Sequence, residues 1–158
     1  MDRQEYEQIT KLYLDSVYRV ALSGCGNKYD AEDVVQNTFI KLWERKEAFA
    51  DDEYARKWLI RVAVNECHNL CRPPWRKKTV YLEEMTMEPI FSHKERSALY
   101  DEVMKLPVKY RQVVHLYYFE EYSVKEIAEL MNLSETAVQT RLLRARQKLK
   151  EALKGAWK

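Results

Sequence analysis

The side chains best suited to chemistry lie near the C-terminal end of this 158-residue chain. An apolar stripe at helical spacing is predicted to face a core there: Val138, Leu142, Ala145 and Leu149. The opposite side of the same helix carries a mostly polar row: Thr136, Gln139, Thr140, Leu143, Arg144 and Gln147. Arginine can bond guanine through two hydrogen bonds, glutamine suits adenine, and threonine or leucine can contact a thymine methyl group. Further basic side chains flank this row, where duplex phosphates would lie: Arg141, Arg146 and Lys148. The pattern predicts a helix that enters the DNA major groove.

The residues before this helix predict the element that positions it. Ser123 and Glu126 form a capping box, which predicts a short helix ending near Met131. Asn132 can adopt the left-handed conformation that a tight turn needs, and Ser134 can cap the long basic helix. Two helices joined by a short turn, with the second one basic, indicate a helix-turn-helix.

A second candidate surface lies on a helix predicted from Asp30 to about Lys46. One arc of this helix is predicted to be core: Ala31, Val35, Phe39, Leu42 and Trp43. The other arc carries polar residues around one isoleucine: Asp33, Gln36, Asn37, Ile40 and Glu44. An exposed isoleucine among short polar side chains suits contact with another protein surface.

A third helix is predicted to end at Arg72, because Pro73 and Pro74 cannot continue it. Its core arc is broad: Leu59, Ile60, Ala63, Val64, Cys67, Leu70 and Cys71. The remaining stripe is mixed: Trp58, Arg61, Val62, Asn65, Asn69 and Arg72. Aromatic, arginine and asparagine side chains on one face can stack on unpaired bases and bond their edges. Alternatively, Trp58 packs against a neighbouring helix.

Composition sets the fold class. Hydrophobic residues make up 46% of the chain and charged residues 33%, with 3 Gly and 4 Pro. We predict an all-α protein of two small helical domains, residues 1–72 and 93–158, joined by a flexible linker over residues 73–92. The net charge is only +2, so nucleic-acid binding must depend on local patches. No apolar run reaches the roughly 18 residues of a membrane span, and three cysteines fit a reducing, cytoplasmic setting.

Two separate blocks of the sequence resemble the extracytoplasmic-function (ECF) bacterial sigma factors. The segment Asp30–Trp43 is similar to the polymerase-binding signature of the family's region 2, and Trp58–Asn65 with Arg72 is similar to its promoter-melting part. The segment Leu106–Leu149 resembles region 4. The chain departs from the Gly-Thr-Val frequent in the family, because it has Thr136-Ala137-Val138 there.

The resemblance implies a function for each surface. The face with Asp33, Gln36, Asn37 and Ile40 would bind core RNA polymerase. The loop near Phe49 to Glu53 would hold unpaired bases of the −10 element. Three residues of the helix that is predicted to end at Arg72 would help it: Arg61, Asn65 and Arg72. The C-terminal helix would bind the −35 element through a third set: Gln139, Thr140, Arg141, Leu143, Arg144 and Arg146. The linker would thread through polymerase, and an anti-sigma factor would be a further partner. No cofactor is implied.

Three alternatives remain open. A stand-alone helix-turn-helix regulator would need a dimer for useful affinity, and no heptad seam is present. A metal sensor could use Cys67 and Cys71 with Cys25, although both helix thiols fall within the apolar arc. An enzyme is disfavoured, because the sequence has no glycine-rich phosphate loop, carboxylate cluster or evident nucleophile–histidine pair.

Overall fold

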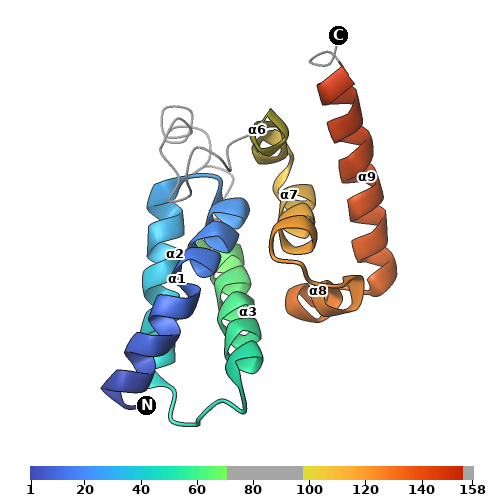
Figure 1. Ribbon diagram of the computed structural model, residues 1–158. Helices are drawn as coiled ribbons and strands as arrows, with labels where there is room; N and C mark the ends of the chain where they lie inside the picture. The colour runs from blue at the N-terminus through green and yellow to red at the C-terminus, as the bar shows by residue number, and fades with distance from the viewer. Residues whose placement is uncertain (71–97, 155–158) are drawn as a thin grey trace. The chain divides into compact units, whose positions relative to one another are not determined.

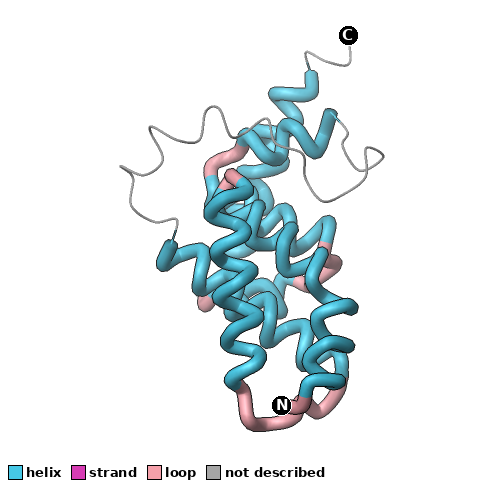
Figure 2. Tube along the Cα trace, turned by 90° about the vertical axis from the view of Figure 1, so that its left-hand side faces the viewer, coloured by secondary structure: helices cyan, strands magenta, loops and turns pink. Residues whose placement is uncertain are grey.

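The computed structural model describes residues 1–70 and 98–154 of the chain (Figure 1). These residues are helices joined by short loops, which confirms the all-α prediction, and no strand occurs among them (Figure 2). The chain divides into two compact units, residues 1–88 and 89–158. That division falls within the predicted linker, whose own residues lie outside the described ranges. Within residues 1–70 and 98–154, no helix is long and apolar enough to cross a membrane.

The N-terminal unit is a bundle of three helices: α1 (Arg3–Cys25), α2 (Lys28–Glu44) and α3 (Asp52–Leu70). Each helix packs on the other two, and α2 runs opposite to its neighbours (Figure 1). The centre of the bundle is filled by aliphatic side chains that are almost fully buried: Val17, Val20, Val34, Leu42, Leu59, Ile60 and Val64. Burial of these apolar side chains stabilises the bundle, because each fully buried one contributes about 1.5–3 kcal/mol.

Two details of α2 differ from the prediction. The helix begins at Lys28 rather than Asp30, because the Asn27 side chain accepts a hydrogen bond from the Asp30 backbone N–H at 3.0 Å and caps the helix. Trp43 was predicted to be core, yet it is 50% exposed and its ring meets Tyr6 edge-on at 5.1 Å. The side of α2 facing α1 and α3 is centred on Val34 and Leu42, which leaves Trp43 at the edge of the bundle.

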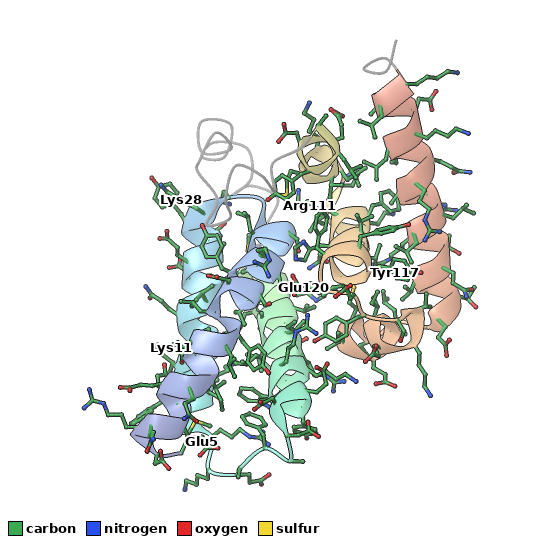
Figure 3. The ribbon with its side chains drawn as sticks, viewed as in Figure 1. Glu5, Lys11, Lys28, Arg111, Tyr117 and Glu120 are labelled. Carbon is green, nitrogen blue, oxygen red and sulfur yellow. The ribbon has the colours of Figure 1, made fainter. Side chains whose placement is uncertain are left out.

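The described residues of the C-terminal unit, 98–154, form five consecutive helical segments: α6 (Ala98–Lys105), α7 (Val108–Val114), η2 (His115–Phe119), α8 (Val124–Met131) and α9 (Glu135–Lys154). Ser92 and Glu95 also match a capping box in the sequence, and both lie outside the described residues. Arg111 ties the first two segments together, because its guanidinium donates to the Met104 and Leu106 carbonyls at 3.2 and 3.4 Å (Figure 3). These carbonyls lie at the end of α6, where helical partners are missing.

Pro107 suits the first turn of a helix, and the sequence predicts that this helix ends near Phe119. In the structure Pro107 is the N-cap of α7, and the α-helix is shorter than predicted. It ends at Val114 and is followed by a single π-helical turn, η2. The Glu120 backbone N–H bonds the His115 carbonyl at 3.1 Å, and the same two residues meet through their buried side chains, with His115 Nε2 2.9 Å from Glu120 Oε2. The sequence did not predict this turn, because it depends on a side-chain pair buried by tertiary packing.

The predicted helix-turn-helix is present. Both hydrogen bonds of the Ser123–Glu126 capping box are formed, and Asn132 has a φ angle of 55° at the end of α8. Ser134 accepts a hydrogen bond from the Ala137 backbone N–H at 3.0 Å and so caps α9. The predicted apolar stripe of α9 is buried throughout: Val138, Leu142, Ala145 and Leu149.

The capping box gives a direct test of this local structure. We expect Ser123→Ala to lower the free energy of unfolding of the C-terminal unit by about 1 kcal/mol, because an N-cap side chain satisfies a helix N–H that otherwise has no partner. Urea unfolding followed by circular dichroism would measure this. Ser123→Asp keeps a capping oxygen and serves as the control. Equal loss of stability in both variants would contradict the capping explanation.

Candidate nucleic-acid interface

Helix α9 carries its predicted DNA-binding residues on the side away from the core. Gln139, Leu143, Arg144 and Arg146 are exposed, and Leu143 remains 55% exposed. Thr140 and Arg141 are partly buried at the borders of this face. The structure therefore brings the predicted set onto one surface, with an apolar side chain among hydrogen-bonding ones. That combination can contact both base edges and thymine methyl groups.

Arg146 is held by aromatic side chains of η2. Its Nε donates a hydrogen bond of 2.7 Å to the Tyr118 hydroxyl. Its guanidinium also lies over two rings, 5.7 Å from the centroid of Tyr117 and 5.6 Å from that of Tyr118. Tyr117 lies on the side of η2 that faces α9 (Figure 3). Cation–π contacts of this kind favour a defined orientation of the guanidinium.

Arg144 lies in a cluster of basic groups around Tyr110. The Lys109 ammonium lies 5.1 Å from the centroid of the Tyr110 ring, and the Lys148 ammonium lies 5.8 Å from it. Burial raises the pKa of the Tyr110 hydroxyl, but a hydrogen bond with Arg144 and the charges of these three basic residues outweigh it. The pKa of Tyr110 is consequently lower than its ordinary value. This cluster joins α7 to α9 and concentrates positive charge on one border of the candidate interface.

The predicted polymerase-binding residues lie on the outer surface of α2. Asp33, Gln36 and Ile40 are exposed, and Asn37 is partly buried. Ile40 is 54% exposed, although it is a large aliphatic residue in the middle of the helix. The four side chains recur at helical spacing, so they form one continuous strip. A strip of short polar groups around an exposed isoleucine is chemically suited to a protein interface.

The predicted base-holding face of α3 is only partly described. Arg61 and Asn65 are exposed on it, whereas Arg72 lies outside the described residues. Trp58 packs against the loop between α2 and α3, with its ring 5.6 Å from that of Phe49. The Arg45 guanidinium lies over both rings, 4.3 Å from the Phe49 centroid and 5.1 Å from the Trp58 centroid. Trp58 therefore has a packing partner, as the alternative interpretation proposed, but that partner is the loop.

A hollow of about 590 Å³ opens beside this loop. Its walls come from α1, from the loop and from the start of α3, and include Leu12, Phe49 and Asp52. The Tyr13 hydroxyl donates a hydrogen bond of 3.0 Å to the Asp52 carbonyl, which joins α1 to the beginning of α3. The predicted base-holding loop thus borders a cavity that could admit a small planar group.

The cysteines of the N-terminal unit lie in its interior. Cys25 and Cys67 are 5% and 2% exposed, and their sulfur atoms lie 3.7 Å apart. Cys25 is disulfide-bonded and Cys67 is a free cysteine, so the contact between these two sulfur atoms is not the disulfide. The disulfide differs from the expectation that the cysteines are reduced. Cys71 lies outside the described residues. Within the part of the chain that the structure describes, no group of three potential metal-ligating side chains comes together.

Comparisons with known proteins match both units of the chain. Family models for Sigma-70 region 2 and Sigma-70, region 4 match residues 9–77 and 96–149. The ECF RNA polymerase sigma factor SigM of Bacillus subtilis (strain 168) is 31% identical, with 91% of this chain and 92% of SigM covered. The chain belongs to the ECF sigma factors. SigW of the same organism is 28% identical, with 97% of this chain and 91% of SigW covered.

Solved structures of similar fold include two sigma factors. The sigma factor RpoE of Bartonella quintana, solved in complex with the anti-sigma factor NepR, has a TM-score of 0.70 and 22% identity. That comparison covers 96% of this chain and 98% of RpoE. CnrH, solved with the cytosolic domain of CnrY, has a TM-score of 0.67 and 25% identity, with 98% and 90% covered. As an ECF sigma factor, the protein binds core RNA polymerase and directs promoter-specific initiation of transcription.

Sequence reasoning missed the tyrosines of this sigma factor that hold the arginines of α9. Tyr110 and Tyr118 are separated from Arg144 and Arg146 by the whole of α8 and the turn. Neither pair follows a helical or strand period, so no local pattern connects them. The run of aromatic residues at 117–119 is a local signal for such contacts with arginine, but a run of this kind is equally typical of side chains packed in a core.

The Tyr110 cluster predicts a distinctive titration. Ultraviolet absorbance of tyrosinate would be followed with rising pH in the wild type and in Tyr110→Phe. The difference should have a midpoint below the ordinary value of 10.0, because nearby positive charge favours the phenolate. Tyr18→Phe is the matched control: burial and then Glu32 raise the pKa of Tyr18, so its difference should have a midpoint above 10.0. Coincident midpoints would contradict the described cluster.

Proposed function

We propose that the two units of this sigma factor divide promoter recognition between them. The C-terminal unit binds the −35 element: Gln139, Thr140, Leu143 and Arg144 contact base edges, and Arg141 and Arg146 contact phosphates. The predicted N-terminal domain, residues 1–72, binds core polymerase through Asp33, Gln36, Asn37 and Ile40. It also holds unpaired −10 bases through Arg61, Asn65 and Arg72. Residues 73–92 connect the two activities.

The observation that carries the −35 assignment is the outward face of α9. Its opposite side is buried from Val138 to Leu149, so the helix cannot rotate away from the orientation it has. Gln139 and Leu143 are one turn apart on the exposed side, near the N-terminal half of the helix. In helix-turn-helix proteins that half of the second helix contacts base edges. Arg141 and Arg146 lie along the borders of this face, where phosphates run.

The polymerase assignment is supported by the exposed strip on α2. Ile40 gives this strip an apolar centre, and the neighbouring polar groups can form hydrogen bonds around it. The −10 assignment is supported by the exposed Arg61 and Asn65 and by the hollow that borders Phe49 and Asp52. A flipped base needs both a cavity and hydrogen-bonding groups at its edge.

Regulation by an anti-sigma factor follows from the same surfaces. RpoE and CnrH, which share the fold, were each solved with a partner, NepR and the cytosolic domain of CnrY respectively. A partner that covered α2 or α9 would block polymerase or promoter binding. The protein acts in the cytoplasm, where transcription takes place, and its contribution is binding rather than catalysis.

The −35 assignment is tested by transcription. Purified core polymerase, the full chain and a promoter library would be used in run-off assays. Gln139→Ala should relax the preference at a single −35 position, since a well-placed base contact contributes about 1–3 kcal/mol of discrimination. Gln147→Ala makes the same change further along the helix and should leave the preference unchanged. An unaltered −35 profile with Gln139→Ala would overturn the assignment.

The polymerase assignment has its own test, which needs no DNA. We expect Ile40→Asp to weaken binding of the full chain to core polymerase by about tenfold or more, because a charge replaces the apolar centre of the strip. Leu12→Asp is the control, since Leu12 is also exposed, at 58%, but lies on α1. Fluorescence anisotropy with a labelled chain would give both affinities. Equal affinity for both variants would place the polymerase contact elsewhere.

A further inference from the structure

Arg146 is the best-defined arginine of the candidate DNA-binding surface. One of its donors, Nε–H, is engaged by the Tyr118 hydroxyl at 2.7 Å. The rings of Tyr117 and Tyr118, which meet edge-on at 4.9 Å, support its guanidinium. A guanidinium has five N–H donors, so four remain available to another acceptor.

The Tyr118 hydroxyl is an uncharged hydrogen-bond partner, so it does not neutralise the Arg146 guanidinium. A carboxylate in the place of the Tyr118 hydroxyl would neutralise the guanidinium and compete with an external anion. A phenol is uncharged at neutral pH and accepts a hydrogen bond through its oxygen. Within the described ranges, Arg146 takes part in no ion pair. The side chain is exposed, fully charged and restrained in orientation.

Helical register places Arg146 beside the base-reading row. Gln139 and Arg146 are seven residues apart, which is close to two turns, so they lie on the same side of α9. With the outward face of α9 in the major groove, a side chain on its border approaches the strand backbone. A guanidinium held there meets a phosphate, whose oxygens match its paired donors.

We propose that Tyr118 is a positioning residue that holds the Arg146 guanidinium in the orientation that binds a promoter phosphate. This proposal rests on the proposed binding of α9 to the −35 element. An arginine side chain has many rotamers, and ordering them opposes binding. A hydrogen bond and two rings already restrict the rotamers of Arg146 in the free protein. The side chain therefore loses less conformational entropy when it binds a phosphate.

A second tyrosine–arginine pair shows the same arrangement on the other border of α9. Arg144 lies close enough to Tyr110, which extends from α7, to lower the pKa of its hydroxyl. Residues two apart along a helix differ in direction by roughly 200°, so Arg144 and Arg146 point to opposite sides. The two segments before the helix-turn-helix, α7 and η2, thus each place one tyrosine beside one arginine of α9. Both arginines keep their charge for an external anion.

The test uses the full chain assembled with core polymerase and promoter fragments that differ only in the −35 element. Dissociation constants would be measured over a series of salt concentrations for Tyr118→Phe, Arg146→Gln and the double variant. Tyr117→Phe is the matched control, since its ring also contacts Arg146 but no hydrogen bond from its hydroxyl to Arg146 occurs. Tyr118 is 50% exposed, so thermal unfolding of Tyr118→Phe should match that of the wild type.

We expect Tyr118→Phe to weaken binding about three- to tenfold, the cost of ordering one long side chain on binding. The loss should be equal for all −35 sequences, and the salt dependence should be unchanged because no charge is removed. Arg146→Gln should weaken binding and reduce the salt slope by about one. Adding Tyr118→Phe to Arg146→Gln should have no further effect, and Tyr117→Phe should bind like the wild type.

Other outcomes would overturn the positioning role. Tyr118→Phe could bind promoter DNA as tightly as the wild type or more tightly. The losses of the two single variants could be additive in the double variant, or Arg146→Gln could leave the salt slope unchanged. In each of these cases the −35 assignment stands if Gln139→Ala still changes the sequence preference. If neither Arg146→Gln nor Gln139→Ala has any effect, the proposed function of α9 fails and the positioning role fails with it.

Discussion

The burial of one apolar stripe fixes the orientation of α9, and the candidate DNA-binding surface depends on it. Val138, Leu142, Ala145 and Leu149 are packed against the preceding helices, so the opposite side of α9 must face solvent. This constraint alone determines which side chains can enter a groove. The left-handed Asn132 ends α8 and turns the chain toward the start of α9. A change in the stripe would therefore alter DNA recognition without touching any DNA-contacting residue.

Charge in this sigma factor is local rather than global. The chain has a net charge of +2, so its overall field attracts DNA weakly. The basic groups are instead concentrated on α9 and at Lys109 of α7, and tyrosines accompany them. Weak intrinsic affinity suits a protein whose promoter binding depends on polymerase, since a few phosphate contacts alone are readily lost as salt increases. The uncharged Tyr118 hydroxyl beside Arg146 leaves the guanidinium charge available for a phosphate.

In the N-terminal unit, α2 and α3 each bury one side in the core and expose candidate binding residues on another side. Val34 and Leu42 of α2 fill the bundle while Ile40, on the same helix, remains exposed. The same division holds on α3, where Leu59, Ile60 and Val64 are buried and Arg61 and Asn65 are not. Such helices tolerate little rotation, because turning one to improve packing would remove its outward residues from their surface. Stability and binding therefore impose a single register on each helix.

The sequence by itself determined the features that repeat at a helical period. It predicted the all-α class, the buried stripe of α9, the Ser123 capping box, the turn at Asn132 and the exposure of Ile40, because each depends on residues within a few positions of one another. It was wrong about the start of α2 and about Trp43, where the packing of three helices decided which side chains reached the core. Tertiary structure alone decided the π-helical turn at His115, the contact between Trp58 and Phe49, and the pairing of Tyr110 and Tyr118 with Arg144 and Arg146. These features join residues from different elements, and only packing brings such residues together.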